Sequence, residues 1–107
     1  MSIDIHAHII PPDFVSSLQD GDYGVDISID GEKVHASVSG GRAIGDLRAE
    51  LRDVEARLTA MDDAGVDVQV LAGWIDLNGY VLSEAHGTSY SRLFNESLAG
   101  VAAAHPD

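Results

Sequence analysis

Near its beginning the chain reads Ile3-Asp4-Ile5-His6-Ala7-His8-Ile9-Ile10-Pro11-Pro12. Isoleucines at positions 3, 5 and 9 alternate with polar residues, and this period of two is typical of a β-strand whose two faces differ. Proline lacks the amide hydrogen that a strand ladder needs, so the strand is expected to end by residue 10. Because alternate side chains project to the same side, the pattern places Asp4, His6 and His8 in one row.

The two histidines of this row stand about 6–7 Å apart along the backbone of an extended strand. At that spacing their ring nitrogens can converge on one cation, and imidazole is the commonest protein ligand for zinc-type metals. Two unpartnered histidines would be costly to bury in an apolar strand, and a metal ion would remove that cost. We therefore interpret His6 and His8 as half of a metal site, with two surface or hydrogen-bonded histidines as the alternative.

Length and charge limit the remaining possibilities. The 107 residues allow at most one modest domain, taken here as residues 1–107. Eighteen Asp and Glu against six Lys and Arg give a formal charge of −12, which disfavours nucleic acid and anionic membranes as partners. The absence of cysteine excludes a disulfide framework and a thiolate metal site. Without a signal-peptide pattern or a membrane-length apolar run, the expected location is cytoplasmic.

Residues 11–45 are predicted to leave the body of the fold and return to it. Residues 13–24 show no sustained period, as a loop or a short helical turn would. Residues 25–29 and 34–38 each alternate apolar with polar residues around Asp30-Gly31, which predicts a β-hairpin. His35 has no partner at strand spacing and is interpreted as a solvated residue on the polar face of that hairpin.

Residues 46–107 change to a helical period and then to a strand. Apolar residues recur at steps of three and four between 46 and 64, which predicts one amphipathic helix capped by Asp46 and ended by Gly65. Asp53 and Arg57 are spaced as an ion pair within it.

Residues 66–72 form a β-branched run that predicts a strand buried on both faces, and the order helix, glycine, strand indicates a parallel sheet. The connection 73–87, with Trp74 and His86, is either a functional loop or an ordinary surface loop. A second helix is predicted over 89–104 and is stopped by His105-Pro106.

Three blocks of the sequence resemble a known family. They are Ile3-Asp4-Ile5-His6-Ala7-His8 with Pro11 close behind, Arg57-x-x-x-Met61-Asp62-x-x-Gly65-Val66-Asp67-x-Gln69-Val70, and Ala104-His105-Pro106-Asp107, with Gly79-Tyr80 and Asn95 between the last two. In this order they resemble the amidohydrolase-related, metal-dependent decarboxylases of the aminocarboxymuconate semialdehyde decarboxylase type. The resemblance implies an α/β fold: the N-terminal portion of a (β/α)8 TIM barrel with a β-hairpin insertion after the first strand.

The resemblance also implies roles for individual residues. His6 and His8 match the two first-strand ligands of a divalent metal, normally zinc. Arg42 falls near the arginine that holds a substrate carboxylate, with an ordinary surface arginine as the alternative. The other metal ligands and the catalytic histidine of the family come from later strands, and His86 and His105 are not expected to replace them.

The implied activity is zinc-dependent decarboxylation of a small carboxylated substrate, a lyase reaction. Relatives with the same first strand are hydrolases or hydratases, so these reactions remain alternatives, as does a non-catalytic fragment or subunit that binds a partner. Only about two of the eight barrel strands are present, so the chain is expected to be inactive alone. We expect a complementary chain that completes the barrel or, as a second choice, a homo-oligomer.

Overall fold

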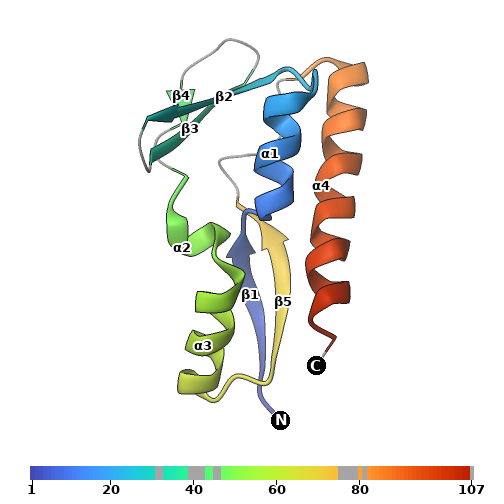
Figure 1. Ribbon diagram of the computed structural model, residues 1–107. Helices are drawn as coiled ribbons and strands as arrows, with labels where there is room; N and C mark the ends of the chain where they lie inside the picture. The colour runs from blue at the N-terminus through green and yellow to red at the C-terminus, as the bar shows by residue number, and fades with distance from the viewer. Residues whose placement is uncertain (31–32, 39–42, 45–46, 75–79, 81, 107) are drawn as a thin grey trace.

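The protein is a mixed α/β structure in the computed structural model, which describes residues 1–30, 33–38, 43–44, 47–74, 80 and 82–106 (Figure 1). Its elements follow the chain as β1 (Ile3–Ile9), α1 (Pro12–Asp20), β2 (Val25–Asp30), β3 (Lys33–Val38), β4 (Ala43–Ile44), α2 (Ala49–Arg52), α3 (Val54–Ala64), β5 (Val68–Gly73) and α4 (Glu84–Ala104). Within the described ranges no helix combines the length and the apolar character that a membrane crossing needs.

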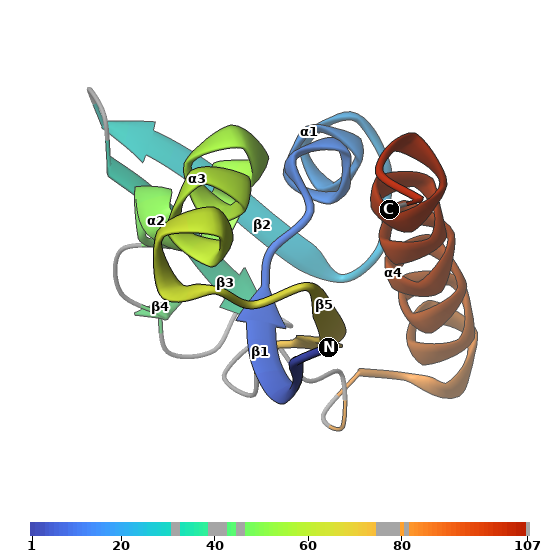
Figure 2. The same ribbon diagram turned by 90° about the horizontal axis from the view of Figure 1, so that it is seen from below.

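Two small sheets form the framework. β1 and β5 pair in parallel, as the order helix, glycine, strand predicts, and β2, β3 and β4 form an antiparallel sheet. Helices α3 and α4 flank the parallel pair, and α1 stands beside α4 (Figures 1 and 2). The mixture of helices and strands confirms the coarse α/β class. The described strands form no closed barrel.

The hydrophobic core lies where α1, the hairpin and α4 meet. Its buried members are Ile10, Phe14, Val15, Leu18, Val25, Val34, Ala36, Leu47 and Tyr90. The Phe14 ring packs edge-on against Tyr90 and Phe94, with ring centroids 5.2 and 5.0 Å away. This core closes the structure above the carboxyl ends of β1 and β5.

Helix α1 replaces the loop or short turn expected after the two prolines. Pro12 occupies the first turn, where its missing N–H is no loss, and Phe14, Val15 and Leu18 share one buried face. These three residues supply a helical stripe too short to be distinguished from a loop by its period alone. Packing against the core therefore stabilises a helix that the local pattern only suggests.

The hairpin is confirmed, with β2 and β3 paired from Val25 opposite Val38 to Asp30 opposite Lys33. Its turn residues, 31 and 32, lie outside the described residues. His35 is half-buried and lies opposite Ser28, between the buried residues Val34 and Ala36 of its own strand.

The single helix predicted over 46–64 is wrong, because α2 and α3 are separated at Asp53. The extended backbone of Asp53 (φ −90°, ψ 100°) makes it the N-cap of α3, and its carboxylate accepts a hydrogen bond from the N–H of Ala56 at 2.9 Å. The predicted cap Asp46 lies outside the described residues. Gly65 ends α3 in the left-handed region with φ 72°, as predicted.

Two further expectations need correction. β5 is not buried on both faces, since Val68 and Val70 are exposed and the alternate residues Gln69 and Leu71 are half-buried. Helix α4 begins five residues earlier than predicted because the Ser83 hydroxyl accepts a hydrogen bond from the N–H of His86. His86 therefore lies in a helix rather than a loop, while α4 ends at Ala104, before His105-Pro106, as expected.

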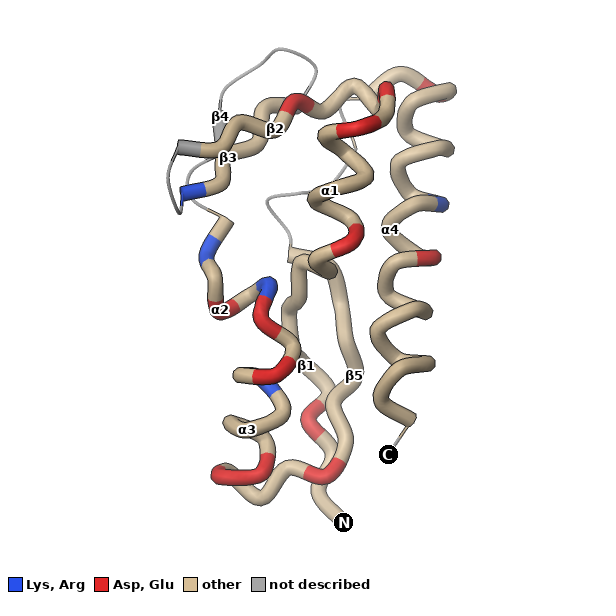
Figure 3. Tube along the Cα trace, in the orientation of Figure 1, with Lys and Arg blue, Asp and Glu red and all other residues tan. Residues whose placement is uncertain are grey.

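Charge is distributed unevenly over this framework. Figure 3 shows acidic residues along α1 and α3, whereas β5 and the last two turns of α4 carry no charged residue. β5 and the end of α4 therefore form an uncharged part of this framework.

Candidate metal centre

A β-bulge in β1 decides which way the histidines point. Asp4 pairs with Gln69 and Ala7 pairs with Leu71, so three steps along β1 match two along β5. An extra residue of this kind puts two consecutive side chains on the same side of a strand. Ile5 is 80% exposed and His6 is also exposed, whereas Ala7 is buried. The alternation of the strand therefore changes phase between Ile5 and Ala7.

This change of phase separates Asp4 from the two histidines. The Asp4 carboxylate accepts a hydrogen bond from the Gln69 side chain at 3.2 Å, on the side of the sheet that faces α3. The Nε2 atoms of His6 and His8 instead lie within hydrogen-bond distance of each other. The predicted row of three is wrong for Asp4, and the structure keeps only the histidine pair together.

The histidine pair, His6 and His8, converges through its Nε2 atoms. These atoms are 3.1 Å apart, and the rings lie nearly perpendicular, at 83°. The Nδ1 atom of His8 lies 3.0 Å from the carbonyl oxygen of Gly73. A carbonyl only accepts hydrogen bonds, so Nδ1 of His8 carries the proton and Nε2 of neutral His8 keeps its lone pair.

This arrangement allows two states of the pair. Without a cation, Nε2–H of His6 donates to the lone pair of His8 Nε2. With a cation, His6 takes the other neutral tautomer and both Nε2 lone pairs become available. In a tetrahedral zinc site with Zn–N bonds of about 2.0–2.1 Å, two ligand nitrogens are about 3.3 Å apart. The observed 3.1 Å requires only a small adjustment, so the pair fits two positions of such a site.

The Gly73 carbonyl acts on His8 as outer partners of metal-binding histidines commonly do. A hydrogen bond to the second ring nitrogen fixes the tautomer and the orientation of the ring. Gly73 has no side chain, and a Cβ placed there would lie 2.6 Å from the Phe94 ring. The close approach of α4 to the end of β5 therefore requires glycine at this position.

The pair is located at the carboxyl ends of the two parallel strands. His8 lies opposite Ala72, and Gly73 is the last residue of β5. In parallel α/β folds this edge is the usual place for ligands. Below the pair, the exposed side chains of the two strands form an apolar surface that we name the open face; its members are Ile3, Ile5, Val68 and Val70.

A complete coordination sphere is not formed by the described residues. Within them, no group of three or more His, Cys, Asp or Glu side chains is arranged to hold a metal ion. His86 Nε2 lies 3.3 Å from an Asp22 carboxylate oxygen, and His105 lies beyond the end of α4, so neither joins the pair. The predicted substrate residue Arg42 lies outside the described residues.

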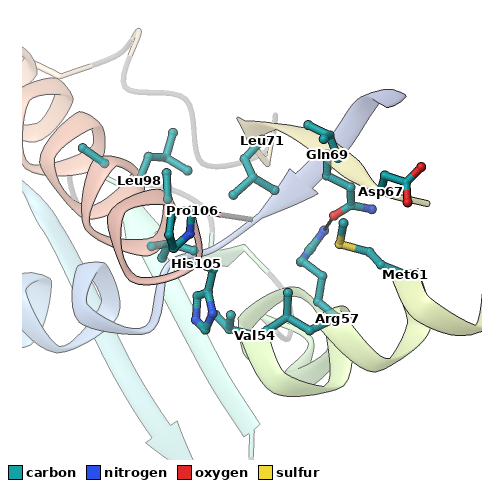
Figure 4. Close-up of a pocket in the computed structure, with 14 residues that line it drawn as sticks. Val54, Arg57, Met61, Asp67, Gln69, Leu71, Leu98, His105 and Pro106 are labelled. Carbon is teal, nitrogen blue, oxygen red and sulfur yellow. Dashed lines mark hydrogen bonds between the residues drawn. The ribbon is translucent and has the colours of Figure 1, made fainter. Parts of the chain in front are cut away.

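The side of the sheet away from the histidines carries a groove between α3, β5 and α4. It has a volume of about 370 Å³ and mainly apolar walls (Figure 4). Arg57 reaches across it from α3 to β5, where its Nη1 donates to Gln69 Oε1 at 3.1 Å. The predicted ion pair of Arg57 with Asp53 is wrong, because the guanidinium turns to the strands and Asp53 caps the helix.

The link from Arg57 through Gln69 to Asp4 was not predicted from the sequence. A signal for it exists: Arg57 lies on the same face of α3 as Val54, Leu58 and Met61, where a solvated arginine is out of place. Gln69 likewise interrupts an otherwise apolar strand.

Compared with models of known protein families, the chain matches none. Evidence for a function consequently comes from the geometry of the histidine pair and from the sequence motifs.

Proposed function

We propose that this chain is the N-terminal part of a zinc-dependent enzyme of the amidohydrolase-related decarboxylase type, with His6 and His8 as two of the metal ligands. The observation that carries the proposal is the convergence of the two Nε2 atoms at 3.1 Å, with the tautomer of His8 set by Gly73. A hydrogen bond from the second ring nitrogen to a carbonyl is the usual outer contact of a metal-binding histidine. The location of the histidine pair at the carboxyl edge of the parallel strands supports the same interpretation.

Each residue of the pair has a defined task in this proposal. His8 presents a fixed lone pair, because its other nitrogen donates to Gly73. His6 is exposed and, among the described residues, is held through its backbone N–H and through His8, so its ring can change tautomer. When bound, zinc supplies a Lewis acid that lowers the pKa of water toward neutrality.

The substrate in this proposal is a small carboxylate that loses carbon dioxide. Arg42 would hold a carboxylate of the substrate in a bidentate grip, which a guanidinium provides and an ammonium does not. Hydrolysis or hydration by the same half-site is the alternative reaction. A subunit that binds a partner without chemistry is the alternative of a different class.

The wider fold follows from the same proposal. β1 and β5 would be the first two strands of a (β/α)8 barrel, and the β2–β3 hairpin would be its insertion after the first strand. The open face would then be the interior of the barrel, covered by further strands of a complementary polypeptide that bring the remaining ligands. A second copy of this chain is the less favoured partner, because it offers only another histidine pair.

Zinc titration by calorimetry tests the metal part of the proposal. The wild-type chain is expected to bind zinc, and the double variant His6→Ala/His8→Ala is expected to lose this binding while its circular dichroism spectrum is unchanged. His35→Ala is the matched control, because His35 lies on the hairpin away from the pair. Equal binding by the wild type and the double variant would contradict the proposal.

The reaction class is tested on the complex of this chain with its complementary polypeptide. Carbon dioxide release from small unsaturated carboxylates is measured beside hydrolysis of esters and amides by the same preparation. Decarboxylation that disappears in the double histidine variant supports the proposed lyase. Hydrolysis that disappears in its place supports the alternative, and a complex with neither activity supports the non-catalytic subunit.

A further inference from the structure

The bulge in β1 is fixed at both ends by side chains. At its beginning, the N–H of His6 donates to Asp4 Oδ1 at 3.1 Å, and the other oxygen of Asp4 accepts from Gln69. Beyond its end, the carbonyl oxygen of His8 accepts from Nη2 of Arg57. A bulge interrupts the strand ladder, so such partners decide whether it persists.

One guanidinium connects the two ends. Arg57 donates through Nη1 to Gln69 Oε1 and through Nη2 to the His8 carbonyl. Gln69 bridges Arg57 and Asp4, because its amide oxygen accepts from Arg57 while its amide nitrogen donates to Asp4. The amide orientation of Gln69 is therefore determined by a donor on one side and an acceptor on the other.

Arg57 occupies a site where a cation is costly. Its Nε atom is buried and has no hydrogen-bond partner among the described residues. Burial lowers the pKa of the guanidinium, and the negative charge of Asp4 partly opposes this effect. An apolar residue on this face of α3 would avoid the cost of burying a cation. An apolar residue, however, could not supply the two directed hydrogen-bond donors of the planar guanidinium.

We propose that Arg57 is a positioning residue for the histidine pair, holding the bulge that turns His6 and His8 together onto the open face. This inference rests on the proposed zinc function and adds a residue that touches neither imidazole ring. Without Arg57, the strand is expected to regain its ordinary alternation. That alternation would turn His6 and His8 from the open face toward α3 if the register of residues 3 and 4 is kept, and would take His8 away from the Gly73 carbonyl.

Three variants test the inference in the full chain. Arg57→Met keeps the length and apolar stem of the side chain and removes both donors. Arg57→Lys keeps the charge and supplies one ammonium in place of the planar guanidinium. Arg52→Met is the matched control, because Arg52 also donates to a backbone carbonyl, that of Leu47 at 2.8 Å, but lies in α2 away from the bulge.

Two readouts are taken on each variant: zinc affinity, and the histidine ring ¹⁵N signals of the metal-free chain, which report the Nδ1–H tautomer of His8. Arg57→Met is expected to weaken zinc binding by about tenfold or more, because loss of the bulge would take from His8 its outer partner, the Gly73 carbonyl. It is also expected to lose the fixed His8 tautomer. Arg57→Lys should recover part of both, and Arg52→Met should match the wild type.

The outcomes separate this inference from the proposed function. Zinc affinity within twofold of the wild type and unchanged His8 signals in Arg57→Met would overturn the positioning role while leaving the zinc function intact. If the wild type binds no zinc but Arg57→Met still loses the His8 tautomer, the zinc function is contradicted and the control of the bulge by Arg57 is supported. If Arg57→Met fails to fold, the Arg57→Lys variant decides between the outcomes. Wild-type zinc affinity and wild-type His8 signals in Arg57→Lys would overturn the role of the guanidinium.

Discussion

The core around α1 and the open face of the β1–β5 pair are built from similar residues but are treated differently by the fold. Phe14 and Ile10 are fully buried between α1, the hairpin and α4. Ile5 and Val70, which are equally apolar, remain 80% and 52% exposed. The first region completes its own packing, whereas the second ends as an uncovered surface with the histidine pair at its edge.

The difference indicates which region provides stability and which one we propose to be functional. Covered apolar area contributes about 25 cal/mol per Å² to folding, and exposed side chains contribute little of this. An apolar surface left exposed beside converging polar groups is typical of a binding region. The core around α1 therefore holds the chain together, and the open face is available to other strands and to a ligand.

The largest expected effect comes from breaking the core. Phe14→Ala removes a ring that contacts both Tyr90 and Phe94, and should lower the free energy of unfolding by about 3–5 kcal/mol. Denaturant unfolding followed by circular dichroism measures it. Phe14→Leu, which keeps most of the volume, is the control and should lose less. A loss below about 1 kcal/mol for Phe14→Ala would mean that the core around α1 is not the main source of stability.

A smaller effect in the same core depends on pH. Burial raises the pKa of Tyr90 to about 12 from an ordinary value of 10.0. Above pH 10 the unfolded chain releases this proton while the folded chain retains it, so stability falls as pH rises from about 10 to 12 by on the order of 2 kcal/mol. Tyr90→Phe should show a flatter alkaline limb than the wild type in unfolding measurements. Parallel limbs for the two proteins would contradict the burial of this hydroxyl.

The smallest effect on stability is expected on the open face. Ile5→Lys should change the free energy of unfolding by less than about 0.5 kcal/mol, because its side chain is already exposed. It should nonetheless shift the chain toward monomer in size-exclusion chromatography with light scattering. Ile29→Lys, at an exposed isoleucine of the hairpin, is the matched control and should leave the mass unchanged.

The same measurement tests whether the chain acts alone. The wild type is expected to associate, since its described parallel pair leaves strand edges and apolar side chains uncovered. A stable wild-type monomer with cooperative unfolding would refute that expectation.

Period and turn signals were sufficient for several elements of the fold. Alternating residues predicted β1 and the hairpin, and the glycine after α3 predicted the entry to a parallel strand. The break at Asp53 was missed because the apolar stripe of the predicted helix continues across the break. Only the cap geometry of Asp53 shows that a new helix begins there. Helix α1 was missed because its three buried residues span little more than one turn.

The candidate site shows more clearly what sequence patterns alone do not predict. Spacing alone paired His6 with His8, but it also placed Asp4 beside them and gave all the isoleucines one face. In the structure Ile5 is exposed while Ile9 is fully buried, because the bulge lies between them. The contacts of the bulge come from Arg57 and Gln69, which are distant in sequence. No local period contains that information.

Histidine ring ¹⁵N spectra recorded during a zinc titration test the central claim most directly, because they follow each of the five histidines of the chain separately. We predict that the Nε2 signals of His6 and His8 shift together as zinc is added, that Nδ1 of His8 keeps its proton, and that His35, His86 and His105 are unaffected. Equal shifts at all five histidines, or a response that omits His6 or His8, would contradict the assignment of this pair as a metal half-site.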